Sequence, residues 1–372
     1  MAALRAVQGP IHRIRTSVGD EGWRVIGHAE VRMLLTDDRL GRAHPEPEKA
    51  ARTGESALFG GPLGNFATEQ ADHARMRGLL QPHFTPKLMR ALAPRVDELT
   101  TGLLDRLADS GSPADLVEAV AEPLPVLVIC ELLGVPYEDR DRFRAWARDA
   151  ADTEDRGRSE HGLAALFGYG TELVARKRAH PGDDVITRLA TTPGVSDEEA
   201  AGLGMALLFA GHETTVVQIG LGALHLLADP EQWRALARDP ALLAGAVEEV
   251  LRAPARSGGG IPRYARTDLE IAGTVVRAGE LVLLDTGAAN HDATVFPDPD
   301  RFDIHRSTAA HLTFGHGPRY CVGAPLARIE LHSVFGRLAT RFPAMRLATP
   351  VSDLVFRTGT LTGGLVTLPV AW

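Results

Sequence analysis

Cysteine is scarce in this sequence. The 372 residues include only Cys130 and Cys321, which argues against a disulfide framework and favours a reducing compartment such as the cytoplasm. A tetrahedral zinc site is also disfavoured, because neither cysteine has a second cysteine or a spaced histidine pair beside it. Cys130 follows an apolar run over residues 125–129, where we expect a buried and unreactive thiol. Cys321 is left as the candidate for cysteine chemistry.

The chain also lacks an excess of positive charge and any long run of apolar residues. Its 40 lysine and arginine residues are outnumbered by 48 aspartate and glutamate residues, which gives a formal net charge of -8. A protein that binds nucleic acid usually carries a dominant basic face, so this balance argues against that class. No stretch without charges reaches the length of a membrane span, and the N-terminus shows neither a secretion signal nor a membrane anchor. We expect a soluble, cytoplasmic protein.

What the sequence does contain is helical patterning. Hydrophobic residues make up 44% and charged residues 24%, the composition of a globular protein. Because no repeat and no polar linker divides it, we expect one domain over residues 1–372, mainly α with a smaller β-rich portion and without a fused reductase. Helices are expected over residues 29–36, 72–166 with breaks at prolines such as Pro94, 196–228, 240–252 and 324–340; strands over 23–26, 269–272, 274–277 and 281–284; and a hairpin over 354–370 around Gly363 and Gly364.

The longest of these helices begins with a capping box. Ser196 is followed three residues later by Glu199, and the helical pattern continues to Ala228 before Asp229 and Pro230 end it. This length is well above the average for helices of globular proteins. A helix so long and so apolar is typical of the middle of a domain.

A glycine-rich loop surrounds the remaining cysteine. Gly315, Gly317 and Gly323, together with Pro318, exclude a helix and allow the backbone to approach a flat ligand closely. The helix expected from residue 324 would place Cys321 just before a helix N-terminus, which favours the thiolate. A thiolate is the form that ligates haem iron. The loop is also compatible with a structural cysteine, or with a cysteine nucleophile whose partner base the spacing does not identify.

This segment resembles the signature of the cytochrome P-450 superfamily. Phe314, Gly317, Cys321 and Gly323 occupy the positions of its Phe-x-x-Gly-x-x-x-Cys-x-Gly pattern, and Arg319 lies at its basic position. Further motifs of the family occur in the right order along essentially the whole chain. The resemblance implies the cytochrome P-450 fold, with haem b between the long helix and the cysteine loop and with Cys321 as the iron ligand.

The long helix carries the second motif. Residues 210–215, Ala-Gly-His-Glu-Thr-Thr, resemble the oxygen-binding segment of the family. A glycine within a helix costs about 1 kcal/mol relative to alanine, and small residues at Ala210 and Gly211 would let a planar group and dioxygen lie against the helix. The resemblance implies that Glu213 and Thr214 are the catalytic acid and alcohol that deliver protons. Taken alone, both are compatible with ordinary helix residues.

A third motif lies on the helix expected to end near residue 252. Glu249 and Arg252 form a Glu-x-x-Arg pair on one helical face, which is usually only a weak surface contact. The resemblance implies instead a buried structural ion pair, which Arg301 joins from a downstream segment.

Four cationic residues fall where the family binds the two propionate groups of haem. These carboxylates need cationic or N–H partners, and the resemblance assigns that role to His73, Arg77, Arg263 and Arg319. Together with these four, the expected cofactor site contains Ala210 and the loop residues Phe314, Gly315, Cys321 and Gly323.

The resemblance implies a monomeric monooxygenase that uses dioxygen and takes electrons from NAD(P)H through a separate ferredoxin reductase and ferredoxin. Arg75, Lys87 and Arg90 are candidates for a basic surface that binds the acidic ferredoxin. The expected activity is the hydroxylation or epoxidation of a bulky, mostly apolar small molecule during the tailoring of antibiotic- or polyketide-type natural products. By family position, the substrate pocket draws on Leu58, Phe59, Phe66, Leu163, Phe167, Leu207, Gly259, Ile261 and Leu361.

Two alternatives stay open. The same fold also supports oxidative coupling, ring closure or peroxide-driven oxidation, and a non-catalytic haem carrier or sensor is the alternative from another class. The acid and alcohol of the long helix favour the use of dioxygen. Turnover that depends on NAD(P)H and dioxygen would separate an enzyme from a carrier.

Overall fold

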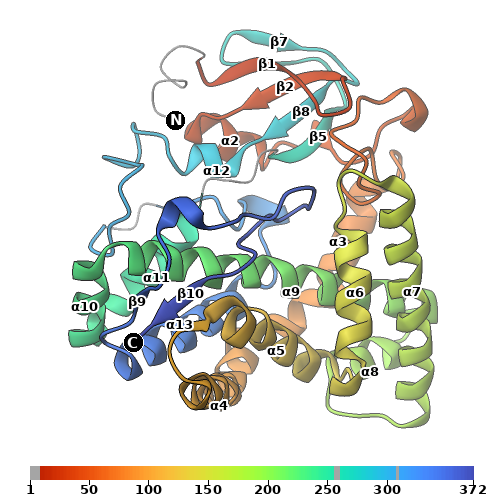
Figure 1. Cartoon of the computed structure of the whole chain (residues 1–372). Coiled ribbons are helices and arrows are strands. Elements are labelled where there is room, and N and C mark those ends of the chain that lie inside the picture. Colours follow the sequence, from red (N-terminus) through yellow and green to blue (C-terminus); the bar gives the residue numbers. More distant parts are fainter. Residues whose placement is uncertain (1–8, 255–259, 307–309) are drawn as a thin grey trace.

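Most helices and most strands of the protein gather in two different parts of the molecule (Figure 1). The computed structural model describes residues 9–254, 260–306 and 310–372. The expected fold class, mainly α with a smaller β-rich portion, is confirmed, and α9 runs through the middle of the helical part. The helices are α2 (His28–Leu34), α3 (Glu69–Leu80), α4 (Pro86–Ser110), α5 (Pro123–Leu133), α6 (Arg140–Ala150), α7 (Arg156–Ala179), α8 (Val185–Thr191), α9 (Asp197–Ala228), α10 (Pro230–Arg238), α11 (Leu243–Arg252), α12 (Thr286–Ala289) and α13 (Ala324–Arg341).

The main sheet has five strands in the order β1-β2-β8-β5-β3. β2 and β8 run parallel, and the other neighbours pair antiparallel. All four residues of the central strand β8 are buried, and the sheet has a hydrophobic cluster of its own. The strands are β1 (Ile11–Arg15), β2 (Glu21–Val25), β3 (Leu40–Gly41), β5 (Ile261–Ala265) and β8 (Leu281–Leu284) in this sheet, β6 (Leu269–Ile271) and β7 (Thr274–Val276) in a hairpin, and β4 (Ala114–Asp115), β9 (Arg346–Leu347) and β10 (Pro369–Ala371) in a smaller sheet.

The long helix α9 is capped and packed as the sequence predicts. Ser196 Oγ accepts the N–H of Glu199 at 3.1 Å, and the helix ends before Asp229, whose side chain caps α10. By length and composition alone α9 could cross a membrane. Its apolar surface is instead covered by α5, α7 and α13, and a Cβ placed on Gly222 would lie 2.7 Å from Phe335 Cζ. Helix α9 is therefore a core helix that approaches its neighbours closely.

Gly211 also serves this packing. A Cβ at Gly211 would lie 2.9 Å from Cδ1 of Ile129 on α5, so the neighbouring helix already fills this side of α9. The expectation that Gly211 leaves room for a planar group is therefore wrong. Ala210, one residue earlier, is exposed and faces another direction.

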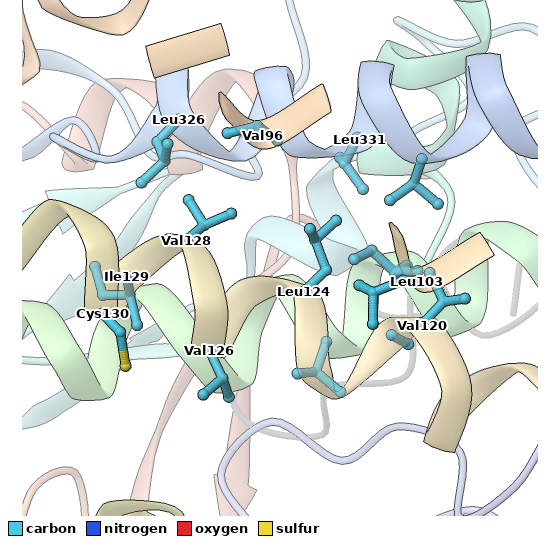
Figure 2. Packing of buried hydrophobic residues seen from close by; sticks show 14 of the residues in the cluster. Val96, Leu103, Val120, Leu124, Val126, Val128, Ile129, Cys130, Leu326 and Leu331 are labelled. Carbon is cyan, nitrogen blue, oxygen red and sulfur yellow. The ribbon is translucent and has the colours of Figure 1, made fainter. Parts of the chain in front are cut away.

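The main hydrophobic core lies where α4, α5 and α13 meet (Figure 2). Val96 of α4, Leu124 and Val128 of α5 and Leu326 of α13 pack together there. Cys130 of α5 is only 4% exposed, and burial raises the pKa of its thiol to about 12. A thiol so protected is unreactive at neutral pH, as its apolar surroundings in the sequence predict.

Two elements differ from expectation because of proline. Helix α4 continues past Pro94, which lies on its exposed side, where water can hydrogen-bond the carbonyl group that loses its helical donor. Strand β5 was not expected, because Pro262 and Arg263 interrupt its apolar pattern. The hairpin around Gly363 and Gly364 is present: the N–H of Arg357 donates to Gly364 O at 2.8 Å.

Candidate active site

Two glycines in the left-handed region shape the cysteine loop. Gly315 and Gly317 have φ angles of 75° and 70°, which a residue with a side chain adopts only with strain. The N–H of Cys321 donates to Phe314 O at 2.8 Å and closes the loop just before α13 begins at Ala324. The loop thus presents one cysteine at the start of a helix.

Cys321 is accessible but crowded. The residue is exposed, yet burial of its sulfur raises the pKa of the thiol, while the N–H groups of Gly323 and Ala324 and the charge of Arg77 act in the opposite direction. Among the described residues, no group of three or more His, Cys, Asp or Glu side chains is placed to hold a metal ion. A metal at Cys321 would therefore need its other ligands from a cofactor.

A second accessible strip lies on the central helix. Ala206, Ala210 and Thr214 are exposed, although most of their neighbours on α9 are buried, and their spacing of four puts them on one face. Thr214 donates its hydroxyl to Ala210 O at 2.8 Å, so its oxygen stays free to accept a hydrogen bond. These three residues are accessible although α9 runs through the middle of the helical part (Figure 1).

Glu213, next to this strip, is a buried carboxyl group. It is 8% exposed, and burial raises its pKa above the ordinary value for glutamate. His212 Nδ1 lies 3.5 Å from Glu213 Oε1, but burial lowers the pKa of His212 to about 3, so its ring is neutral at pH 7. A carboxyl group whose protonated form is favoured by burial is suited to donate a proton near neutral pH.

Three arginines near Glu213 are engaged by another carboxylate. Glu122, just before α5, accepts hydrogen bonds from Arg357 at 2.6 Å and from Arg148 at 3.4 Å, and it is also paired with Arg144. Burial opposes the ionised form of Glu122, but the hydrogen bond from Arg357 and the charge of Arg144 outweigh it and lower the pKa of Glu122. Within the described ranges, no arginine lies within ion-pair distance of Glu213, although these three are near enough to act on its charge.

The predicted propionate-binding cations come together from three elements. Burial, followed by the charges of Arg319 and Arg77, lowers the pKa of His73 on α3. The charge of Arg263 on β5 acts in the same direction. Arg77 donates to Tyr320 O at 2.8 Å, beside the cysteine. Arg263 is 8% exposed, and in the part of the chain that the structure describes its side chain donates only to Pro262 O, at 2.9 Å.

Arg263 shows that positive charge predominates in this cluster. Burial first, then the charges of Arg319 and Arg42, lower the pKa of Arg263 to about 9. A buried guanidinium surrounded by other guanidiniums is costly unless an anion joins it. The two carboxylates of a haem fit this requirement.

Comparison with known proteins decides the family. Residues 183–348 match the family model described as cytochrome P-450. The chain is 43% identical to pentalenolactone synthase of Streptomyces exfoliatus, over 99% of this chain and 95% of that protein. It is 40% identical to the mycinamicin IV hydroxylase/epoxidase of Micromonospora griseorubida, over 98% and 92% of the two chains. The crystal structure of substrate-free PimD, a pimaricin epoxidase, superposes with a TM-score of 0.89 at 40% identity, covering 100% of this chain and 96% of that one.

The chain belongs to the cytochrome P-450 family. These enzymes are oxidoreductases that use dioxygen, hold haem through a cysteine thiolate and take electrons from redox partners. The residues of this cytochrome P-450 fit such a cofactor: Cys321 is the accessible cysteine, Gly315 and Gly317 allow close approach of the backbone, and Arg263 requires an anion.

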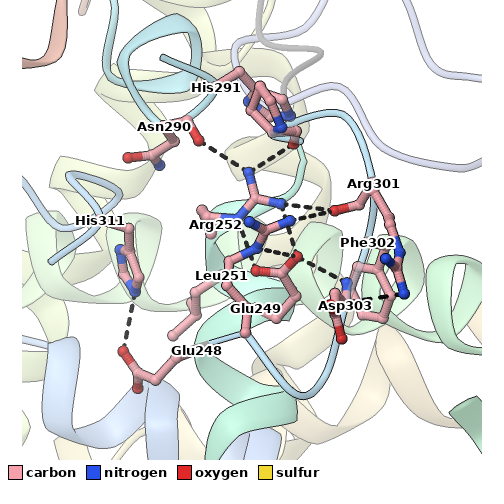
Figure 3. A network of polar contacts seen from close by, with 12 residues as sticks. Glu248, Glu249, Leu251, Arg252, Asn290, His291, Arg301, Phe302, Asp303 and His311 are labelled. Carbon is pink, nitrogen blue, oxygen red and sulfur yellow. Dashed lines mark hydrogen bonds and ion pairs between the residues drawn. The ribbon is translucent and has the colours of Figure 1, made fainter. Parts of the chain in front are cut away.

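The Glu-x-x-Arg pair of this cytochrome P-450 is deeply buried (Figure 3). Arg252 donates to both carboxylate oxygens of Glu249, each at 2.7 Å, and the two side chains are only 3% and 2% exposed. Arg252 also donates to the carbonyl oxygens of Asn290 and Pro299, each at 2.9 Å. The pair thus ties α11 to the segment that leads toward the cysteine loop.

The expectation that Arg301 joins this pair is wrong for its side chain. The guanidinium of Arg301 is 69% exposed and lies 3.8 Å from Asp303, whereas Arg306 Nε donates to Glu249 at 3.2 Å. Arg301 contributes only its carbonyl oxygen, which accepts from Arg252 at 3.4 Å and from Arg306 at 2.8 Å. The downstream segment turns its backbone toward Arg252 and its Arg301 side chain toward solvent.

The expected substrate-pocket residues divide into several groups. Leu207 is buried in the core, and Ala206 lies on the accessible strip in its place. The ring of Phe66 is covered by Arg266, whose guanidinium carbon lies 3.9 Å from the ring centre, so Phe66 belongs to the edge of the cation cluster. Gly259 lies outside the described residues. The other residues are distributed as follows: Phe59 and Phe167 are exposed, and Leu58, Leu163, Ile261 and Leu361 are half-buried.

Hydrogen bonds hold together three segments that contain expected pocket residues. The N–H of Leu361, in the C-terminal hairpin, donates to Ala151 O at 3.0 Å, between α6 and α7. The N–H of Glu55 donates to Thr153 O at 3.1 Å, and the N–H of Ala57 donates to Ser159 Oγ at 3.0 Å. These contacts join the loop before α3, the α6–α7 connection and the hairpin.

One residue of the expected docking surface is already engaged. Arg75 donates to both carboxylate oxygens of Glu199 at 2.6 and 2.7 Å, which links α3 to the first turn of α9. Arg75 therefore serves contacts within the protein, and only Lys87 and Arg90 remain as candidates for binding a partner.

Proposed function

We propose that this cytochrome P-450 hydroxylates or epoxidises a bulky, mostly apolar natural product, with electrons from NAD(P)H that arrive through a ferredoxin reductase and a ferredoxin. The observation that carries the proposal is the accessible strip on α9, where Thr214 lies next to the buried acid Glu213. An accessible alcohol beside a carboxyl group whose neutral form is favoured by burial can hold and pass on a proton.

Each residue of the site has a distinct part in this proposal. Cys321 would bind the iron as a thiolate, and the N–H groups that follow it would stabilise the negative charge on sulfur. The haem, when bound, supplies the oxygen chemistry. Glu213 holds a proton because burial favours its neutral form. Thr214 accepts a hydrogen bond at its free lone pair and orients the delivered proton, while its own hydrogen stays on Ala210 O.

The apolar character of the pocket supports a hydrophobic substrate. Ala206 and Ala210 present methyl groups on the accessible strip, and Phe59 and Phe167 are exposed by 41% and 44%. Such surfaces bind apolar molecules and leave orientation to a few polar groups. By their names, the relatives given above are a pentalenolactone synthase, a mycinamicin IV hydroxylase/epoxidase and an epoxidase of the polyene macrolide antibiotic pimaricin. A natural product of comparable size is the substrate class proposed here.

The working unit we propose is a cytoplasmic monomer, one domain over residues 1–372, that depends on separate electron donors. Lys87 and Arg90 are the remaining candidates for contact with an acidic ferredoxin. Size-exclusion chromatography with light scattering tests the monomer. Reduction of the iron by NADPH with a ferredoxin and its reductase, compared with NADPH alone, tests the dependence on donors.

The first experiment is the absorption spectrum of the dithionite-reduced protein under carbon monoxide. We expect a strongly red-shifted Soret band in the wild type and its loss in Cys321→Ser, whereas Cys130→Ser retains it as a matched control. A wild type without this band, or a Cys321→Ser variant that keeps it, would refute the haem-thiolate assignment.

Product analysis then separates hydroxylation from coupling. One solved relative, 37% identical with a TM-score of 0.85, is described as having biaryl coupling reactivity, so coupling is the second candidate. Macrolides and sesquiterpenoids are screened for binding by the spin-state shift of the Soret band, and ligands that bind are incubated with donors and dioxygen. Gain of an oxygen atom supports the proposal. Loss of hydrogen with formation of a new ring or dimer favours coupling, and an absence of oxygen-dependent turnover favours a carrier or sensor.

A further inference from the structure

Glu69, the first residue of α3, is a buried carboxylate within the cation cluster. It is 7% exposed, and each of its oxygens accepts two hydrogen bonds. Oε1 accepts from the backbone N–H of Arg42 at 2.7 Å and from Arg319 Nη2 at 2.8 Å. Oε2 accepts from the N–H of Ala43 at 3.1 Å and from Arg266 Nη1 at 3.4 Å.

These contacts join four separate segments at one side chain. Arg42 and Ala43 follow β3, Arg266 follows β5, Arg319 lies in the cysteine loop, and Glu69 itself opens α3. A Cβ at Gly41 would lie 2.5 Å from Glu69 Oε2, so the backbone of β3 has to lack a side chain at this point. Such close packing indicates that the position of the carboxylate is closely defined.

Glu69 also lies in register with two of the predicted propionate ligands. Glu69, His73 and Arg77 are spaced by four residues on α3, so they share one face of the helix. The charge of Glu69 acts on His73, Arg263 and Arg42 in the direction that opposes the effect of the neighbouring arginines. Among the described residues, it is the only carboxylate that acts on all three of these cations.

We propose that Glu69 is a positioning residue for the haem edge: it orients Arg319 and balances part of the positive charge that the propionates meet. This inference rests on the proposed function, because it concerns the residues that hold the haem. Arg319 gives one of its donors to Glu69 and keeps the others for the cofactor. Among the described residues, Arg263 has no carboxylate at ion-pair distance, and the charge of Glu69 offsets only part of the effect of burial and of the neighbouring arginines on it.

The charge of Glu69 predicts a sign for the reduction potential of the iron. Reduction adds an electron near the cluster, so removal of a neighbouring negative charge favours the reduced form. Glu69→Gln keeps a side-chain oxygen for the backbone N–H groups but removes the charge. We expect its midpoint potential to rise and its haem to leave about tenfold faster, because the charge-assisted hydrogen bond that orients Arg319 is weakened.

The test measures the midpoint potential by dithionite titration and haem loss by transfer to apomyoglobin. The matched control is Asp72→Asn, which removes a negative charge from the exposed side of the same helix, where Asp72 only accepts from Thr68. A Glu69→Gln protein that matches Asp72→Asn in both measurements overturns the inference, provided the wild type shows the thiolate spectrum. A wild type that binds no haem refutes the proposed function itself.

A second variant covers the case in which Glu69→Gln does not fold. Arg266→Gln removes a positive charge from the other side of Glu69, and its guanidinium is more accessible, with 20% of the side chain exposed. The expected shift of the midpoint potential has the opposite sign, a fall. A rise, or no change, in Arg266→Gln contradicts the proposed balance of charge.

Discussion

Replacement of Arg252 by leucine is the sharpest test of how the fold supports its cysteine loop. Removal of one partner from a buried ion pair costs about 3–5 kcal/mol. Glu249 would keep the hydrogen bonds that it accepts from Arg306 Nε at 3.2 Å and from the N–H of Asp303 at 2.9 Å. The cost of losing its partner Arg252 is therefore at the lower end of this range. The carbonyl groups of Asn290 and Pro299 would lose their donor, at about 1 kcal/mol or more each. We expect a loss of about 5 kcal/mol in the free energy of unfolding.

Urea unfolding followed by tryptophan fluorescence measures this loss. With a slope of about 3 kcal/mol per molar urea, a loss of this size lowers the midpoint by about 1.7 M. The same measurement on two neighbours tests the geometry of the network. Arg306→Leu leaves the Glu249–Arg252 pair intact but removes bonds to Glu249 and to backbone carbonyls, and is expected to cost about 2 kcal/mol. Arg301→Leu removes an exposed side chain and should change the free energy by less than about 0.5 kcal/mol.

The order of the three variants decides the interpretation. If Arg301→Leu costs as much as Arg306→Leu, the side chain of Arg301 joins the network in solution, and the assignment of Arg306 is wrong. If Arg252→Leu costs less than about 1 kcal/mol, water satisfies the groups around Glu249, and the network does not stabilise the fold as argued.

Three further predictions concern single residues of the site and the core. Thr214→Ala should keep haem and substrate binding but release hydrogen peroxide in place of most of the product, measured as peroxide formed per NADPH consumed; normal coupling of electrons to product contradicts the proton-delivery role. His212 has a pKa lowered by burial from 6.5 to about 3, so its burial stabilises the folded state fully above pH 6.5 and progressively less as the pH falls toward 3. The urea midpoint of His212→Gln should therefore fall less between pH 7 and pH 5 than that of the wild type, and equal losses would show that His212 is protonated in the folded state. In haem-depleted protein, a thiol reagent should label Cys321 and leave Cys130 unlabelled, since Cys130 is 4% exposed with a pKa of about 12; labelling that persists in Cys321→Ser contradicts this.

The sequence predicts those structural features that depend on residues close together in the chain. The cysteine loop depends on glycines within a few positions of Cys321, and the start of α9 depends on Ser196 and Glu199, so both follow from local patterns. Pro94 and strand β5 show the limit of local patterns, because the exposed side of α4 and the buried centre of the sheet are set by tertiary packing.

The contacts that the sequence does not predict join residues that lie far apart in the chain. Glu69 and Arg319 are 250 positions apart, and no motif marks the glutamate except its spacing of four from His73. The exchange of Arg301 for Arg306 has the same origin, because the backbone turn at this segment decides which guanidinium reaches Glu249. The sequence does not show which face of α9 packs against another helix and which face stays accessible. Gly211 was therefore expected to face a planar group, whereas the fold places α5 against it.

Both ends of the site follow one electrostatic arrangement. Glu69 engages Arg266 and Arg319, and Glu122 engages Arg144, Arg148 and Arg357, so two buried or half-buried carboxylates bind most of the arginines that surround the active site. In the described part of the chain, the groups left without an opposite charge at ion-pair distance include Arg263 at one end, and Glu213, whose only such neighbour is the neutral His212, at the other. A buried unpaired cation favours an incoming anion, whereas a buried unpaired carboxyl group favours its proton. The structural carboxylates thus leave Arg263 available for a propionate and leave Glu213 without an arginine at ion-pair distance that would favour its ionised form.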